Sequence, residues 1–295
     1  MDFAKLHGLG NDFLVANAGQ AGDEQISLAA LARNLCDRHC GIGADGVVFF
    51  QPTSGDHEAD FSALIFNADG SRAEMSGNGV RCLAAFLVHS GLHCSSALRI
   101  RTVSGVKQLT LQGNDRLVYW FRCSMGIPIL DPAKIPATLG SSPGPVLEYP
   151  LHVGSETVNV SLSSMGNPHC STFWPDLEKA PFQKLGPQLE AHSGFPRRAN
   201  VEFIQIVDRH TIRARFWERG VGPTRCSGTG GSAAAVATIL NGKAQSPVRV
   251  LTEMGHLDVE WESGRELFLT GPAELICTGV CSQEVKSALH LNSPE

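Results

Sequence analysis

The stretch that decides the fold is Phe66-Asn-Ala-Asp-Gly-Ser-Arg-Ala-Glu-Met-Ser-Gly-Asn-Gly-Val-Arg-Cys-Leu-Ala-Ala-Phe86. Residues 60–66 are apolar at alternate positions and predict a strand, and residues 79–91 carry apolar side chains at helical spacing and predict a helix. Between them, Met75-Ser-Gly-Asn-Gly79 is a turn of small residues that opens onto the helix. The N–H groups at a helix N-terminus have no intrahelical partner, so this turn can hold a carboxylate or a phosphate beside Ser76.

The chain repeats this stretch at residues 212–236, where a strand, a glycine-rich turn and a helix follow in the same order. Ser227-Gly-Thr-Gly230 corresponds to Ser76-Gly-Asn-Gly79, and Phe216 corresponds to Phe66. Two further pairs precede them: Gly8-Leu-Gly-Asn-Asp-Phe13 with Ser164-Met-Gly-Asn-Pro-His169, and Ala44-Asp-Gly-Val-Val-Phe-Phe50 with Ala199-Asn-Val-Glu-Phe-Ile204. Three matches in the same order, each offset by roughly 150 residues, indicate two halves built on one plan, with one cleft between them.

Composition is that of an ordinary globular protein with room for two domains. The 295 residues are 42% hydrophobic and 18% charged, and the formal net charge is −5. This charge and the lack of a basic run argue against a nucleic-acid partner. No apolar run approaches the ~20 residues of a membrane span, and the N-terminus lacks the order of a signal peptide. We therefore expect a cytoplasmic protein without a membrane partner.

The nine cysteines form no CxxC pair, and their number is odd. Cys36-Asp-Arg-His-Cys40 imitates a metal site, but no matching pair follows it in the sequence. We expect no metal site and no disulfide framework, and most of the cysteines to be small buried side chains.

The remaining patterns predict an α+β protein whose sheets are antiparallel rather than doubly wound. Helices are expected at 26–40, 79–91, 176–191 and 229–241, and strands at 2–17 (two, around a turn), 47–50, 60–66, 98–103, 106–111, 117–121, 147–162 (two), 201–207, 211–217, 248–253, 256–261, 266–270 and 273–281. Residues 163–169 are expected to form a loop, and the Pro-rich segment 127–145 a linker. We expect an N-terminal lobe over 1–124, a C-terminal lobe over 125–272 and a tail over 273–295 that returns to the N-terminal lobe.

Several motifs together resemble the diaminopimelate epimerase family. They are Gly8-Leu-Gly-Asn-Asp-Phe13, Asn67-Ala-Asp-Gly-Ser71, Ser76-Gly-Asn-Gly-Val-Arg-Cys82, Gly166-Asn-Pro-His169, Glu218-Arg-Gly-Val-Gly222 and Ser227-Gly-Thr-Gly230. The resemblance implies two lobes related by a pseudo-twofold axis, each a curled antiparallel sheet or barrel around a central helix. It also implies an isomerase that converts LL- into meso-diaminopimelate, for lysine and peptidoglycan synthesis, without pyridoxal phosphate or another cofactor.

By this resemblance, two groups on opposite sides of the substrate take and return the α-proton. Their positions are Ser76 and Ser227, and His169 and Glu218 adjust their proton affinity. The α-carboxylate would lie at the N-termini of the two central helices, held by Gly77, Asn78, Gly228 and Thr229. The distal end of this small amino acid would be held by Asn67, Asn167, Asn200, Glu218 and Arg219, with Asn11 nearby. A homodimer is compatible with the sequence, which does not decide the oligomeric state.

The sequence departs from the family at its two reacting positions, where the family has cysteines. A serine hydroxyl is far less acidic than a thiol and needs a base beside it. The glutamate usual in Gly-Glu-Thr is Pro223 here, and Cys226 replaces the small residue before the second reacting position.

Three functional hypotheses follow from these two serines. Under the first, the protein is a two-base epimerase whose serines are activated by His169, Glu218 or water. Under the second, it runs a related racemisation, isomerisation or dehydration on another amino acid. Under the third, it binds an amino acid without turning it over. Engineered replacement of two cysteines would also explain the serines, although the altered neighbours Pro223 and Cys226 favour a natural sequence.

Overall fold

The computed structural model of the protein describes residues 1–20, 27–53, 55–73, 76–139 and 144–281. The chain divides into two compact units. Unit 1 consists of Met1–Cys123 and the chain from Pro272 onward, and unit 2 consists of Ser124–Gly271.

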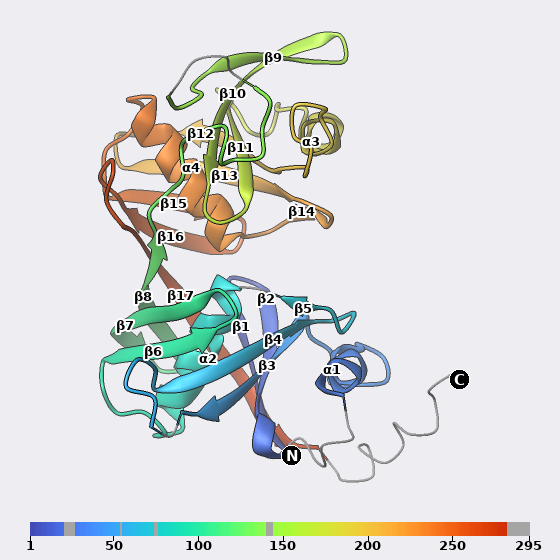
Figure 1. Cartoon of the computed structure of the whole chain (residues 1–295), viewed down its shortest axis with the longest axis vertical. Helices are drawn as coiled ribbons and strands as arrows, with labels where there is room; N and C mark the ends of the chain where they lie inside the picture. Colours follow the sequence, from blue (N-terminus) through green and yellow to red (C-terminus); the bar gives the residue numbers. More distant parts are fainter. Residues whose placement is uncertain (21–26, 54, 74–75, 140–143, 282–295) are drawn as a thin grey trace. The chain divides into compact units, whose positions relative to one another are not determined.

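Unit 1 is a ring of strands around one central helix (Figure 1). Its elements are β1 (Asp2–Gly8), β2 (Asn11–Asn17), the 3-10 helix η1 (Ala18–Gln20), α1 (Leu28–Cys36), β3 (Gly46–Pro52), β4 (Phe61–Asn67), β5 (Arg72–Ala73), α2 (Gly77–His89), β6 (Ala97–Thr102), β7 (Gly105–Asp115), β8 (Val118–Gly126) and the second part of β17 (Leu267–Val280). The pairings β1–β2–β3–β4–β6–β7–β8–β17–β1 close the ring. Val80, Leu83 and Leu87 of α2 are buried in one core with side chains of the strands, so the helix α2 fills the ring.

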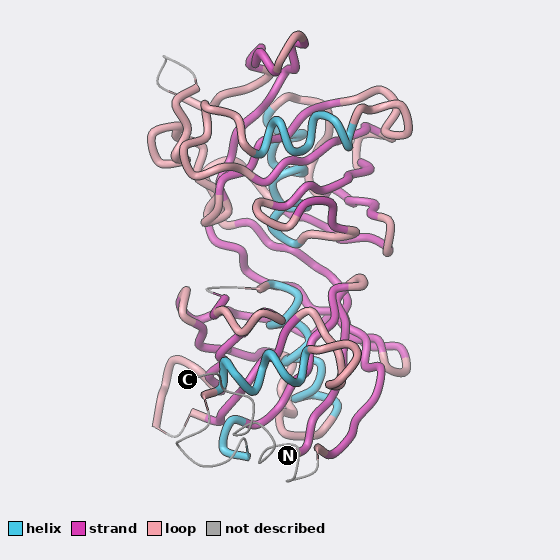
Figure 2. Tube along the Cα trace, turned by 90° about the vertical axis from the view of Figure 1, so that its right-hand side faces the viewer, coloured by secondary structure: helices cyan, strands magenta, loops and turns pink. Residues whose placement is uncertain are grey.

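Unit 2 begins with an additional strand, β9, and from β10 onward repeats the order of unit 1. Its elements are β9 (Tyr149–Val153), β10 (Glu156–Ser164), β11 (Pro168–Phe173), α3 (Phe182–Glu190), β12 (Asn200–Ile206), β13 (Thr211–Glu218), β14 (Gly222–Thr224), α4 (Gly228–Leu240), β15 (Val248–Thr252), β16 (Gly255–Glu260) and the first part of β17. Neighbouring strands follow the order β9–β10–β11–β12–β13–β15–β16–β17. Within each unit, Figure 2 shows helices lying among the strands.

The two units repeat one strand topology, as the sequence predicted. β1–β2–β3–β4 correspond to β10–β11–β12–β13, β6–β7 correspond to β15–β16, and α2 corresponds to α4. The expectation of purely antiparallel sheets was wrong, because β2–β3, β4–β6, β11–β12 and β13–β15 are parallel pairs. Each parallel pair is joined by one of the four α-helices, since parallel neighbours need a long crossover connection. The α+β barrel-like lobes expected from the sequence are confirmed, with mixed sheets.

The last two predicted strands are one continuous strand, β17. The sequence predicted separate strands at 266–270 and 273–281, with Gly271-Pro272 between them. Proline has no N–H to donate to a sheet. β17 pairs with β16 up to Thr270 and with β1 from Glu274 onward. Pro272 therefore lies where the strand changes partners, and neither of these ladders loses a hydrogen bond.

Several predicted boundaries were also wrong. The loop expected at 163–169 shrinks to residues 165–167, since β10 and β11 extend into it. The helix expected at 26–40 ends at Cys36, because the Asp37 carboxylate accepts from the N–H groups of His39 and Cys40. The linker expected at 127–145 is more than a linker, since Ile135 and Leu139 are buried in the core of unit 2. The short strands β5 and β14 were not predicted.

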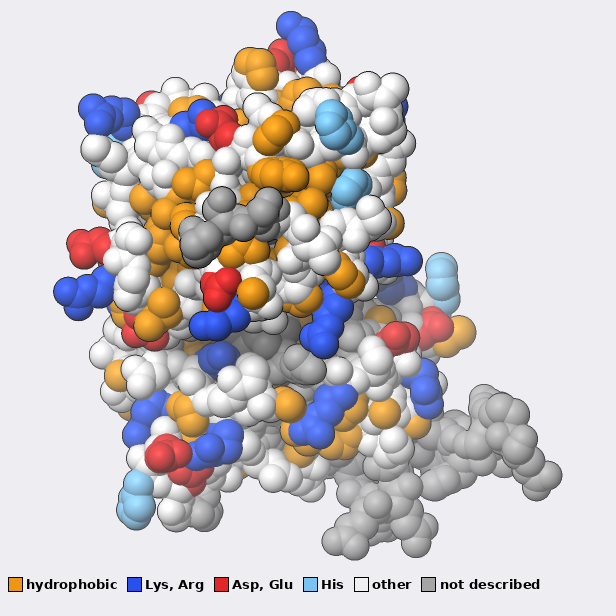
Figure 3. Space-filling model, turned by 45° about the horizontal axis from the view of Figure 1, so that its top comes forward, with side chains coloured by type: hydrophobic (Ala, Val, Ile, Leu, Met, Phe, Trp, Pro, Cys, Tyr) orange, Lys and Arg blue, Asp and Glu red, His pale blue; other side chains and the backbone are white. Residues whose placement is uncertain are grey.

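Five of the nine cysteines are buried, as expected for most of them, and Cys40, Cys94 and Cys277 are exposed. Figure 3 shows Lys and Arg side chains interspersed with Asp and Glu on the visible face. Among the described helices, none has the length and apolarity needed to cross a membrane.

Candidate active site

The first half-site is the N-terminus of α2. Ser76 caps this helix in an extended conformation, and its Oγ accepts from Gly79 N–H at 3.1 Å. A serine at this position satisfies one of the orphan N–H groups of the first turn. The helix begins at Gly77, two residues before the predicted start, so Gly77 and Asn78 both lie in the first turn.

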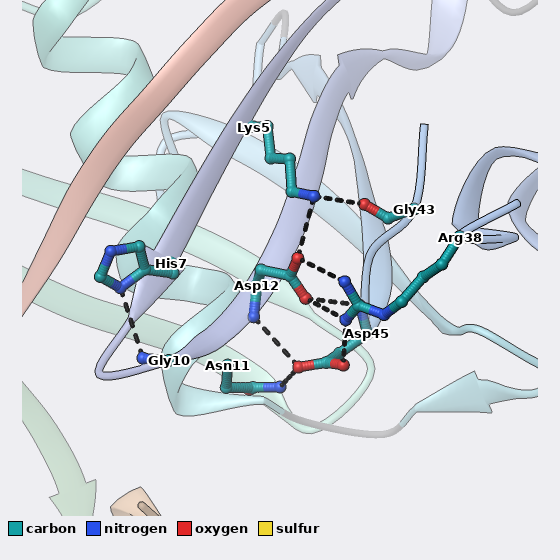
Figure 4. A network of polar contacts seen from close by, with 8 residues as sticks. All are labelled: Lys5, His7, Gly10, Asn11, Asp12, Arg38, Gly43 and Asp45. Carbon is teal, nitrogen blue, oxygen red and sulfur yellow. Dashed lines mark hydrogen bonds and ion pairs between the residues drawn. The ribbon is translucent and has the colours of Figure 1, made fainter. Parts of the chain in front are cut away.

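Asn78 is hydrogen-bonded to Asn11, and Figure 4 shows the polar network that holds Asn11. Asn78 Nδ2 donates to Asn11 Oδ1 at 3.1 Å, and Asn11 Nδ2 donates to Asp45 Oδ2 at 2.8 Å. Arg38 bridges Asp45 and Asp12, at 2.8 Å from each. Burial raises the pKa of Asp12, but hydrogen bonds from Arg38 and Lys5 outweigh burial and leave the pKa below its ordinary value. Asp12 thus stays ionised, and the hydrogen bonds of Asp12, Asp45 and Asn11 hold the β1–β2 turn beside α2.

The Asn67 side chain forms its hydrogen bond within its own turn and not with this network. It is exposed in the turn between β4 and β5, where its Nδ2 donates to Ser71 Oγ at 2.9 Å. The same turn is tied to Asp45 by the Ala68 N–H, which donates to the Asp45 carbonyl at 3.0 Å.

The second half-site is the N-terminus of α4. Ser227 caps this helix with φ −139°, against −138° for Ser76, and its Oγ accepts from Gly230 N–H at 3.2 Å. Glu218, at the end of β13, interacts with the Ser227 hydroxyl. Burial raises the pKa of Glu218, whereas the Ser227 hydroxyl and the His169 ring act to lower it. This half-site therefore places a carboxyl group of raised pKa beside the hydroxyl.

His169 is held by a buried carboxyl group. Its Nδ1 lies 2.6 Å from Glu202 Oε1, and its Nε2 lies 3.0 Å from Asn167 Oδ1. Ser171 Oγ donates to the other Glu202 oxygen at 2.9 Å. Burial raises the pKa of Glu202, and Glu218 raises it further, while His169 and Ser171 lower it. The contacts of both ring nitrogens, with Glu202 and with Asn167, fix the orientation of the His169 ring.

Asn200 joins the remaining predicted residues of unit 2. Its Nδ2 donates to the Pro168 carbonyl at 3.0 Å, and its Oδ1 accepts from Arg219 N–H at 3.0 Å. The Arg219 side chain is exposed and donates to the Arg197 carbonyl at 3.2 Å. Asn167, His169, Asn200 and Arg219 are thereby linked through the starts of β11 and β12 and the turn after β13.

Several polar residues of these half-sites were not predicted, among them Asp45, Arg81 and Glu202. For Arg81 and Glu202 a signal was available in the sequence, because a charged residue inside a run of apolar ones is rarely buried without a partner. Glu202 lies between Val201 and Phe203 in a predicted strand, and Arg81 lies in the first turns of an apolar helix. Their partners are distant in sequence, so the sequence alone could not name the contacts.

Comparison with known proteins decides the family. The family model for diaminopimelate epimerase matches residues 3–129 and 161–276. The chain belongs to the diaminopimelate epimerase family. Diaminopimelate epimerase of Acaryochloris marina is 45% identical over 285 residues, covering 95% of this chain and 98% of that one. Diaminopimelate epimerase of Pelotomaculum thermopropionicum is 43% identical over 282 residues, with the same two coverages.

A solved structure of a probable proline racemase from Agrobacterium radiobacter, with bound carbonate, has a similar fold. The TM-score is 0.67 at 17% identity, over 95% of this chain and 92% of that one. Within the described residues, no group of three or more His, Cys, Asp or Glu side chains is arranged to hold a metal ion.

Proposed function

We propose that the protein is an epimerase that inverts an α-carbon of diaminopimelate, with Ser76 and Ser227 as its two proton-transfer groups. The observation that carries this proposal is the pair of serine caps in matching geometry, one on the central helix of each unit of a diaminopimelate epimerase family member. The cytoplasmic location expected from the sequence belongs to the same proposal, and a homodimer is compatible with it.

The proposed reaction is a balanced proton exchange. One group takes the α-proton as the C–H bond breaks, and the electron pair spreads into the α-carboxylate. The N–H groups of Gly77, Asn78, Gly228 and Thr229 stabilise this negative charge, as oxyanion donors do. The second group returns a proton to the opposite face. His169 and Asn67, Asn167, Asn200 and Arg219 orient the substrate and the reacting groups.

Glu218 supplies the base that a serine needs. The Ser227 oxygen accepts from Gly230 N–H, so its own proton remains available to donate to Glu218. A carboxyl group with a raised pKa is a better base near neutral pH than an ordinary glutamate. In the α2 half-site, the positive helix end and the cation Arg81 favour the deprotonated form of Ser76.

A second candidate is an amino-acid-binding protein without turnover. It is favoured by the two hydroxyl groups themselves, since a serine is a much weaker acid than the thiol of the family pattern. Under this candidate, Asn167, Asn200 and Arg219 recognise the ligand, and the serines only cap their helices.

The test is conversion of LL-diaminopimelate, followed by chiral separation of the products and by calorimetry of binding. We expect the meso isomer to form, and Ser76→Ala and Ser227→Ala each to abolish its formation while binding persists. Arg219→Ala should raise KM through loss of distal contacts. Binding without conversion would support the binding protein, and neither binding nor conversion would overturn diaminopimelate as the substrate.

A further inference from the structure

Arg81 is a fully buried cation in the second turn of α2. Its side chain has no accessible surface, and it is the largest fully buried side chain among the described residues. Nε donates to the Pro272 carbonyl at 3.3 Å, and Nη2 donates to Asn78 Oδ1. Nη1 makes no hydrogen bond to the described residues, and no described carboxylate forms an ion pair with Arg81.

The guanidinium lies against the start of its own helix. A Cβ atom built on Gly77 would be 3.7 Å from Arg81 Nη1, and one built on Gly8 would be 3.2 Å from Nη2. The unpaired Nη1 is therefore beside the first turn of α2, and the two glycines leave room for the group.

Two physical terms oppose a cation at this place. A buried charge loses its hydration and needs a counter-charge. The N-terminus of a helix is also its positive end, where an added cation is unfavourable and an anion is favourable. Packing alone does not explain Arg81, because an apolar side chain would fill the volume without either cost.

The equivalent position in α4 shows that the fold does not require this charge. Counting from Ser76 and from Ser227, Arg81 corresponds to Ser232. Ser232 is also fully buried, and its Oγ donates to the Gly228 carbonyl of its own helix at 2.9 Å. The two helices have the same length and the same cap geometry, so the cation is a property of the α2 half-site.

We propose that Arg81 is a positioning residue for a carboxylate bound at the N-terminus of α2. It adds a fixed positive charge beside the Gly77 and Asn78 N–H groups, and it locks the Asn78 side chain against Asn11. This inference rests on the proposed function, which places the substrate α-carboxylate at these N–H groups. The larger share of carboxylate binding then falls on α2, and α4 supplies the base.

The test uses acetate as the probe, titrated against the full-length, isotope-labelled protein by amide NMR. The dissociation constant is read from the Gly77 and Asn78 amides in wild type, Arg81→Gln, Arg81→Lys and Arg99→Gln. Arg99→Gln is the matched control, because it removes one positive charge from unit 1 at the partly exposed Arg99–Asp60 pair. We expect Arg81→Gln to weaken acetate binding about tenfold, as for loss of one charge-assisted contact, Arg81→Lys to weaken it less, and Arg99→Gln to leave it unchanged.

Equal dissociation constants for Arg81→Gln and Arg99→Gln would overturn the inference, as would the lack of any acetate effect on the wild-type Gly77 and Asn78 amides. If Arg81→Gln does not fold, the side-chain nitrogen resonances of Arg81 in the wild type decide. A shift that follows the same acetate dependence supports the inference, and constant resonances contradict it. Failure of the proposed function would show separately, as absence of diaminopimelate conversion by a wild type that still binds acetate.

Discussion

The N-termini of α2 and α4 have the same cap geometry and differ in the charged side chains beside them. Each begins with a serine cap followed by glycine, and each helix has 13 residues. Beside the α2 end lies the buried cation Arg81, whereas beside the α4 end lie the carboxyl groups of Glu218 and, one layer further, Glu202. The two units therefore repeat one cap geometry with different charged side chains beside it, and under the proposed function the α2 end binds the carboxylate while the α4 end accepts the proton.

The largest effect is expected when both serines are replaced by a stronger acid. The double variant Ser76→Cys/Ser227→Cys should raise the rate of α-proton exchange by about 10³-fold, within the range that a well-matched acid–base group contributes. Exchange into LL- and meso-diaminopimelate, measured separately, would show which single cysteine serves which face. An unchanged rate in the double variant would mean that the serines are not the proton carriers.

Removal of the buried carboxylate of unit 2 should cost more stability than removal of an exposed charge in unit 1. Glu202→Ala leaves His169 and Ser171 without a buried partner and should cost about 3 kcal/mol of unfolding free energy. Arg38→Ala should cost less than about 1 kcal/mol, because the Arg38 side chain is 53% exposed. Urea unfolding of both variants tests this difference, and equal losses would contradict it.

Glu218→Gln should lower activity about 10²-fold, because it removes the base beside Ser227. Cap geometry and the Ser76 half-site should be unaffected, so acetate binding at Gly77 serves as the control. Retained activity would show that Ser227 works without Glu218.

The same variant should be more stable than wild type at neutral pH. Burial raises the folded-state pKa of Glu218 above the ordinary 4.5. The stability that Glu218 contributes is therefore complete below pH 4.5 and is lost as the pH rises through the raised folded-state pKa. Glutamine does not titrate, so thermal unfolding should show equal stability of Glu218→Gln and wild type near pH 4. At pH 8 the variant should be more stable by about 1 kcal/mol, a gain typical of replacing a residue that is kept for function at a cost in stability. A gain that is independent of pH would point to another cause.

The smallest effect is expected for removal of the serine caps, a feature that both central helices share. Ser76→Ala and Ser227→Ala should each cost about 1 kcal/mol of stability, through loss of the hydrogen bond to the Gly79 or Gly230 N–H. Chemical denaturation would measure both losses. A much larger loss for one serine would show that the two caps are not equivalent.

The sequence predicted the repeated order of elements because the motifs that mark it are each formed by a few consecutive residues. The two Ser-Gly-x-Gly turns and the apolar runs after them located both central helices within two residues of their starts. Parallel pairing could not be read in the same way, since it depends on partners that lie on either side of a crossover helix. The unbroken β17 was missed because Pro272 signals a break in an isolated strand, and only the change of partner permits it.

The charges of the half-sites were the least predictable part. Glu202 and His169 are 33 positions apart in the sequence, and Arg81 contacts a carbonyl 191 positions away. No periodicity connects such pairs, so their roles emerge only when the chain has folded.

In the proposed mechanism, Ser76 and Ser227, in unlike surroundings, carry separate protons to and from one α-carbon. This mechanism is tested most directly by incubating LL-diaminopimelate with the enzyme in deuterium oxide and stopping the reaction at low conversion. Chiral separation and mass spectrometry then give the deuterium content at the α-carbon of each isomer. We predict one deuterium in the meso product and none in the recovered LL substrate. Equal labelling of product and recovered substrate would reveal a single exchanging group and contradict this mechanism.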